Sequence, residues 1–164
     1  HPDDVPRFAP LQVTATMQAL WACHEPQMDE LTIPFLGPER STWQYPFGSL
    51  ARSGARLAMG SDWPVTSPDP WQAIHVAVNR VALGHADEPL LPEQSLTLSQ
   101  AVLAYTGGSA YVNHLDDAGV IAAGYRADLA VVDRDPFAAG TGEIGATRTD
   151  LTFVDGRCVY ERSP

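Results

Sequence analysis

The sequence predicts an α/β protein with a smaller all-β segment at its C-terminal end. Up to about residue 115, short strand-like runs are interleaved with stretches whose apolar residues recur at helical spacing. From Gly119 onwards the periodicity is that of strands, and Asp155-Gly156 separates two β-rich runs in the pattern most typical of a hairpin. We therefore divide the chain into residues 1–115 and residues 116–164.

The first segment combines two short strands with several helices. Leu11–Gln18 alternates apolar and polar residues, and the compact apolar run before Gly60-Ser61 is typical of a buried strand. Thr97 and Gln100 form a capping-box pattern at a helix start. The segments expected to be helical are 1–10, 47–53, 71–83, 97–106 and 110–114, with Gly54, Gly84 and Gly107-Gly108 as stops. Residues 21–46 contain many prolines, and we expect a long loop with short helical pieces.

The second segment contains four strand-like runs. They are Val120-Ile121, Leu129–Val132, Leu151–Val154 and Arg157–Tyr160.

The composition indicates which kinds of partner the protein should not bind and how its cysteines should occur. The 164 residues carry 20 acidic and 10 basic side chains, a net charge of −10, and every basic residue other than histidine is arginine. Because nucleic acids and anionic membranes bind clustered cations, neither is an expected partner. Cys23 and Cys158 lie far apart, which favours unpaired thiols in a cytoplasmic setting, with a single disulfide as the alternative.

Asp62 is the residue that most strongly suggests chemistry. It follows the apolar run at Leu57–Met59, and Pro64 cannot continue a central strand, so Asp62 should lie at or just past the carboxyl end of that strand. In α/β folds this edge carries functional sites. A carboxylate there can bind a metal or accept a proton from water, whereas the alternative is a turn aspartate that caps the next element.

Four motifs, taken in order, resemble the end of a metal-dependent amidohydrolase of the amidohydrolase-3 branch, which includes N-substituted formamide deformylases. The motifs are Gly60–Val65, Leu96–Thr106, Gly119–Asp133 and Thr152–Tyr160. The resemblance implies that Leu11–Gln18 and Leu57–Ser61 are the last strands of a (β/α)8 barrel. It also implies that residues 119–161 belong to a small β-sandwich. By this resemblance most of the barrel is absent, and the chain corresponds to roughly the last third of an enzyme.

The resemblance also implies a function and a set of site residues. Asp62 matches an aspartate that touches the catalytic metal, most often zinc, and acts as a base in hydrolysis of amide or formamide C–N bonds. His24, Arg40, Tyr45 and Trp63 become candidates for the substrate pocket, and the alternative for each is loop packing or surface placement.

The sequence lacks the other ligands of such a site. It has no His-x-His pair and no lysine, and one carboxylate is fewer than the roughly three protein ligands of a catalytic zinc. We therefore expect the isolated chain to be inactive and to associate with itself or with a missing N-terminal part. The alternative is a noncatalytic scaffold or interaction module derived from an amidohydrolase.

Overall fold

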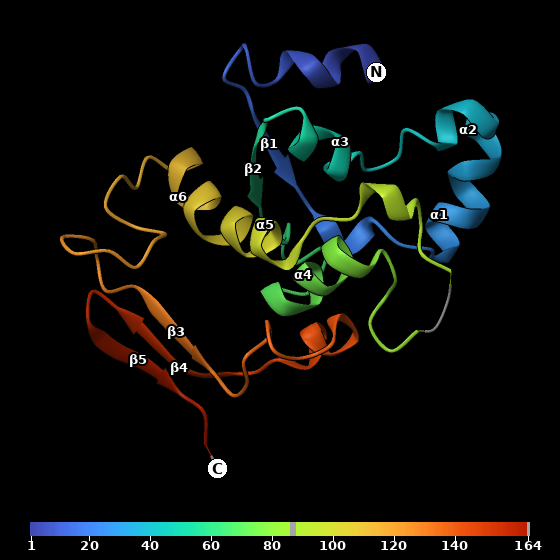
Figure 1. Ribbon diagram of the computed structural model, residues 1–164. Helices are drawn as coiled ribbons and strands as arrows, with labels where there is room; N and C mark the ends of the chain where they lie inside the picture. The colour runs from blue at the N-terminus through green and yellow to red at the C-terminus, as the bar shows by residue number, and fades with distance from the viewer. Residues whose placement is uncertain (86–87, 164) are drawn as a thin grey trace.

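The computed structural model describes residues 1–85 and 88–163 and places their strands in two separate sheets (Figure 1). Strands β1 (Thr14–Met17) and β2 (Arg56–Met59) pair in parallel, with Ala15 opposite Leu57 and Met17 opposite Met59. Strands β3 (Leu129–Val132), β4 (Thr149–Val154) and β5 (Arg157–Glu161) form an antiparallel sheet in that order. The predicted α/β segment and C-terminal β hairpin are both present.

Most of the chain that precedes β2, apart from β1, forms short helices. These helices are η1 (Pro2–Arg7), η2 (Ala19–Trp21), α1 (Pro26–Leu31), α2 (Ile33–Ser41) and α3 (Phe47–Arg52). The α2 segment is broken at Gly37, whose φ of 76° is not helical. Helices α1 and α2 are therefore the short helical pieces expected in residues 21–46. Gly54, with a φ of 79°, follows the end of α3, as predicted.

The segments after β2 depart from the prediction at two helix ends. They are α4 (Pro70–Asn79), η3 (Pro92–Gln94), α5 (Leu98–Leu103), η4 (Ala104–Gly108), α6 (Ser109–Val112) and η5 (Thr141–Ala146). Helix α4 ends at Asn79, where Arg80 adopts the left-handed conformation, so the predicted end at Gly84 is wrong. The capping box at Thr97 and Gln100 is confirmed. The predicted stop at Gly107-Gly108 is wrong, because the helix continues through these residues as a π-helical turn.

The core lies on one face of the β1–β2 sheet. Met17 and Met59 share that face and pack with α4 and α5. On the opposite face Thr16 is exposed, whereas its register partner Ala58 is buried. Parallel sheets are ordinarily covered on both faces, so this one is covered only in part. Ile144 of η5 is 1% exposed and belongs to the same core, which joins the C-terminal segment to α4.

The two-strand sheet does not close a barrel within the described residues, and the three antiparallel strands form one sheet rather than a sandwich. Val120-Ile121 does not form a strand, and Ile121 is 90% exposed. A strand there needs a neighbour for its backbone groups, and no described strand pairs with it. No helix among the described residues combines the length and the apolar character that a bilayer crossing requires.

Candidate functional site

Asp62 lies three residues beyond the end of β2, and its side chain is exposed to solvent. The residue is exposed and has a φ of 54°, in the left-handed region that aspartate and asparagine tolerate better than most residues. Within the described residues, no hydrogen bond or ion pair engages its carboxylate. The placement at a strand end matches the prediction.

The backbone around Asp62 is held by its neighbours. Gly60 N–H donates to the Met17 carbonyl at 3.1 Å, which ties the start of the loop to β1. Ser61 Oγ accepts from Trp63 N–H at 3.2 Å, the Thr66 hydroxyl donates to the Ser61 carbonyl, and Val65 N–H donates to the Asp62 carbonyl at 2.9 Å. These contacts fix the turn that carries Asp62.

The capping role lies with another aspartate. Asp69 Oδ1 accepts from Trp71 N–H at 2.9 Å and caps α4. The alternative for Asp62, a turn aspartate capping the next element, is therefore not what the structure shows. None of the described residues forms a hydrogen bond or an ion pair with the Asp62 carboxylate.

His24 lies in the loop that follows β1 and η2. Its Nδ1 is 2.6 Å from Asp29 Oδ1, and both side chains are about one-third to two-fifths exposed. Because β1 and β2 are parallel neighbours that end opposite each other, the loops of His24 and Asp62 leave the same edge of the sheet. The neighbouring Cys23 is buried and is not disulfide-bonded to Cys158.

The other sequence-predicted pocket residues differ in their surroundings. Trp63 is 67% exposed beside Asp62, and Arg40 is exposed near the end of α2. Tyr45 is half-buried and packs edge-on against the Phe47 ring, with centroids 5.9 Å apart. Burial, with a smaller contribution from Glu25, raises the pKa of the Tyr45 hydroxyl, so it is protonated at neutral pH. Tyr45 packs among core residues, whereas Trp63 and Arg40 face solvent.

Sequence reasoning missed Arg80, the largest fully buried side chain described. It is 0% exposed, its Nε donates to the Leu90 carbonyl at 2.8 Å, and one guanidinium nitrogen donates to the Tyr45 carbonyl at 3.3 Å. Burial lowers the pKa of Arg80 to about 10, which still leaves it charged at neutral pH. Arg80 therefore ties the loop before α3 to the end of α4.

The donor set does not by itself fit a catalytic metal. Among the described residues, no three or more histidine, cysteine, aspartate or glutamate side chains are grouped so that they could hold a metal ion. Asp62 offers one carboxylate, whereas catalytic zinc has about three protein ligands and an open position. Any such centre would need ligands from outside the described residues.

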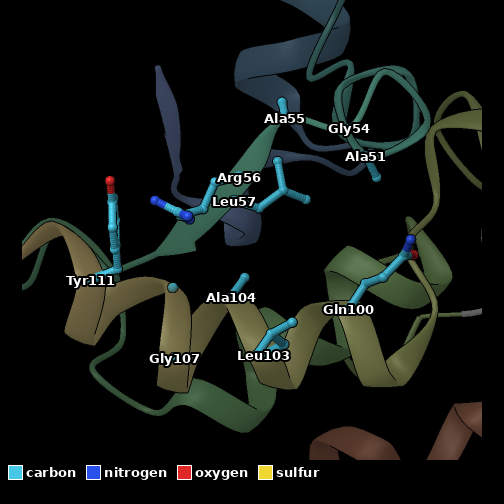
Figure 2. Close-up of a pocket in the computed structure, with 11 residues that line it drawn as sticks. Ala51, Gly54, Ala55, Arg56, Leu57, Gln100, Leu103, Ala104, Gly107 and Tyr111 are labelled. Atoms are coloured by element: carbon cyan, nitrogen blue, oxygen red, sulfur yellow. The ribbon is translucent and has the colours of Figure 1, made fainter. Parts of the chain in front are cut away.

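Two of the cavities in the described part of the chain have linings that do not include Asp62, His24, Trp63, Arg40 or Tyr45. One, of about 560 Å³, lies between α3, β2 and the helix from α5 to α6 (Figure 2). The other, of about 580 Å³, lies between η1 and α3 beside Trp43. The pocket roles of His24, Trp63, Arg40 and Tyr45, and the catalytic role of Asp62, remain predictions.

Comparison with known proteins supports the family resemblance that the motifs indicate. Residues 1–160 match the model of the amidohydrolase family. N-substituted formamide deformylase from Arthrobacter pascens is 35% identical over 120 residues, which are 73% of this chain and 22% of that protein. The resemblance inferred from the motifs is thereby confirmed.

Solved structures give the same result at the level of fold. An uncharacterized metal-dependent hydrolase from Pyrococcus horikoshii OT3 has a TM-score of 0.72 at 30% identity, over 87% of this chain and 28% of that one. Atrazine chlorohydrolase TrzN from Arthrobacter aurescens TC1, solved with zinc, has a TM-score of 0.64 at 20% identity, over 98% and 34% of the two chains. The chain thus matches about a fifth of the length of the curated deformylase and about a third of TrzN.

Proposed function

Because the chain belongs to the amidohydrolase family, we propose that it is the C-terminal part of a metal-dependent hydrolase of amide or formamide C–N bonds. The observation that carries the proposal is the carboxylate of Asp62, exposed just past β2 and without a structural partner among the described residues. The deformylase relative supports the bond type, and the metal-dependent relative supports the reaction class.

In this proposal Asp62 is the base. Its carboxylate accepts a proton from the attacking water as the water oxygen bonds to the acyl carbon. The C–N bond then breaks, and the same carboxyl returns the proton to the departing nitrogen, so that an acid and an amine leave. Trp63, beside Asp62, and His24, in the loop from the same sheet edge, are the residues we expect to shape the substrate pocket, with Arg40 and Tyr45 as further candidates.

A divalent metal, which we expect to be zinc as in the TrzN structure, requires further ligands. These would come from a polypeptide segment other than the described residues, since those residues offer no group of three donors. We therefore expect the isolated chain to hold no stoichiometric metal and to be inactive.

The same proposal predicts a partner for the open sheet. Strands β1 and β2 each have an edge that pairs with no described strand, and β5 is an edge strand that is exposed along its length. Exposed strands of this kind pair with further chain segments. We propose that the missing N-terminal part of the hydrolase covers them, or a second copy in its absence. Sedimentation of the isolated chain as a stable monomer would argue against this association.

The test of function compares the isolated chain with the full product of the gene that encodes it. We expect the longer product to bind zinc and hydrolyse members of a panel of N-substituted formamides and amides, measured by amine release. Asp62→Asn should lower kcat/KM by about 10²–10⁴-fold. Asp116→Asn is the matched control, because Asp116 is exposed and no described residue engages its side chain. Full activity in Asp62→Asn, or stoichiometric zinc in the isolated chain, would contradict the proposal.

The second proposal is a noncatalytic scaffold or interaction module that keeps the fold. It is supported by the absence of a three-donor group among the described residues. The same experiment separates the two: a longer gene product that binds no metal and hydrolyses nothing, yet keeps a partner protein bound, would favour the scaffold.

A further inference from the structure

The cavity of Figure 2 lies at the start of β2, whereas Asp62 lies beyond its end. Its volume of about 560 Å³ falls within the range of small-molecule sites. The middle is apolar: Leu57 and Ala51 face Leu103 and Ala104 across it. Leu103 is 58% exposed, so a large apolar side chain is left open to solvent at this place.

Of the described residues that line the cavity, Arg56 alone is charged. Arg56 lies at one end, where its guanidinium stacks on the Tyr111 ring with 3.4 Å between the guanidinium carbon and the ring centroid. Within the described part of the chain no carboxylate pairs with Arg56, and no hydrogen bond uses its N–H groups. The stacking holds the planar guanidinium in place while its edge stays available for a bidentate acceptor.

A second donor lies at the opposite end. Gln100 accepts from Thr97 N–H at 2.9 Å through its Oε1, as part of the capping box, and this fixes the side-chain amide. Its Nε2 donates to no other described residue. The cavity therefore offers donors at both ends and apolar walls between them, and none of the described residues that line it is acidic.

We propose that this cavity binds a small carboxylate with an apolar chain, the carboxylate at Arg56 and the chain between Leu57 and Leu103. The charge pattern selects this occupant. The guanidinium would repel an amine, and a neutral alkane would form no ion pair with it, whereas a carboxylate would. The site is separate from the hydrolase proposal, because it lies at the other end of β2 from Asp62 and uses none of the catalytic candidates.

Binding is tested on the 164-residue chain with octanoate as the probe, by calorimetry and saturation-transfer NMR. We expect saturable binding of octanoate, weaker binding of octan-1-ol, and none of octylamine or acetate. Arg56→Gln should weaken octanoate binding about tenfold, because a charge-assisted bidentate pair is lost. Arg56→Lys, which keeps the charge but loses the planar stack, should weaken it less.

Two further variants make the test specific. Ala51→Leu fills the cavity without changing charge and should also weaken octanoate binding, whereas Arg157→Gln removes an exposed arginine on β5 and should not. Thermal unfolding of each variant checks that the fold is kept. Equal affinity for octan-1-ol, or unchanged binding in folded Arg56→Gln, overturns the proposal. A dimer that Ala51→Leu dissociates and octanoate does not affect overturns it as well, in favour of an interface between copies.

Discussion

Gly108 packs directly against Leu57, and a Cβ at Gly108 would overlap the Leu57 carbonyl oxygen. The next residue, Ser109, donates its hydroxyl to the Met59 carbonyl at 2.7 Å. The helix from α5 to α6 therefore touches the backbone of β2 at two successive points. This contact holds the strand from whose end the Asp62 loop departs.

The first prediction concerns this contact. Gly108→Ala should lower the free energy of unfolding by about 2 kcal/mol, because the added methyl group must push the helix away from the Leu57 carbonyl. Urea unfolding followed by circular dichroism measures the change. Gly107→Ala is the control: its Cβ would first meet Leu103 Cδ1 at 3.1 Å, at the end of a flexible exposed side chain. We expect the control to be neutral or stabilised by up to about 1 kcal/mol, since alanine favours helix. Equal losses in both variants would contradict the packing argument.

The same glycine pair shows where sequence reasoning failed. A Gly-Gly pair after an apolar helical stretch indicates either a helix end or a close approach of backbones, and the two have the same local pattern. Only the position of β2 decides between them, and that position is a tertiary property. The hairpin at Asp155-Gly156 and the capping box at Thr97 were predictable because their hydrogen bonds join neighbours in sequence.

The candidate site was predictable to a similar extent. The place of Asp62 after a strand follows from the apolar run and Pro64, both local features. The burial of Arg80 was not predictable, because it depends on carbonyl groups at Tyr45 and Leu90, which other segments supply. The closure of a barrel depends on pairing with strands that the described residues do not contain.

The second prediction separates a capping aspartate from an unengaged one. Asp69→Ala should cost about 1 kcal/mol, because the Trp71 N–H at the start of α4 loses its acceptor. Asp62→Asn should change stability by less than about 0.5 kcal/mol, since its carboxylate has no partner among the described residues and asparagine tolerates the left-handed backbone. Thermal and urea unfolding measure both. A larger loss at Asp62 than at Asp69 would mean that Asp62 is structural.

The third prediction concerns the turn between β4 and β5. Asp128 Oδ1 accepts from Asp155 N–H at 2.8 Å, and Gly156 N–H donates to the Ala127 carbonyl at 3.1 Å, so the segment before β3 holds the turn. Asp128→Ala should lower stability by about 1 kcal/mol and increase amide exchange most at Asp155 and along β5. Hydrogen-exchange mass spectrometry locates the change, and Asp116→Ala serves as control. Exchange that rises equally throughout the chain would contradict a local role for Asp128.

The fourth prediction is a pH dependence that His75 brings to stability. His75 is 5% exposed between α4 and η5, and burial lowers the pKa of its imidazole below the ordinary value of 6.5. Its Nδ1 lies 3.2 Å from Asn79 Nδ2, an amide nitrogen that also donates to the Thr141 carbonyl at 2.9 Å. The neutral ring can accept at Nδ1, whereas a protonated Nδ1 would face another donor.

The sign follows from proton binding. Below about pH 6.5 the unfolded chain binds a proton at this histidine that the folded chain does not, so stability falls as the pH drops from about 6.5 towards the lowered pKa. His75→Gln, which keeps an amide for Asn79 and cannot titrate, should lose that part of the acid-side slope. Urea unfolding of both chains at several pH values between about 7 and 5 measures the difference. Parallel slopes would show that His75 titrates alike in the folded and unfolded chains, and that the contact between α4 and η5 is insensitive to its charge.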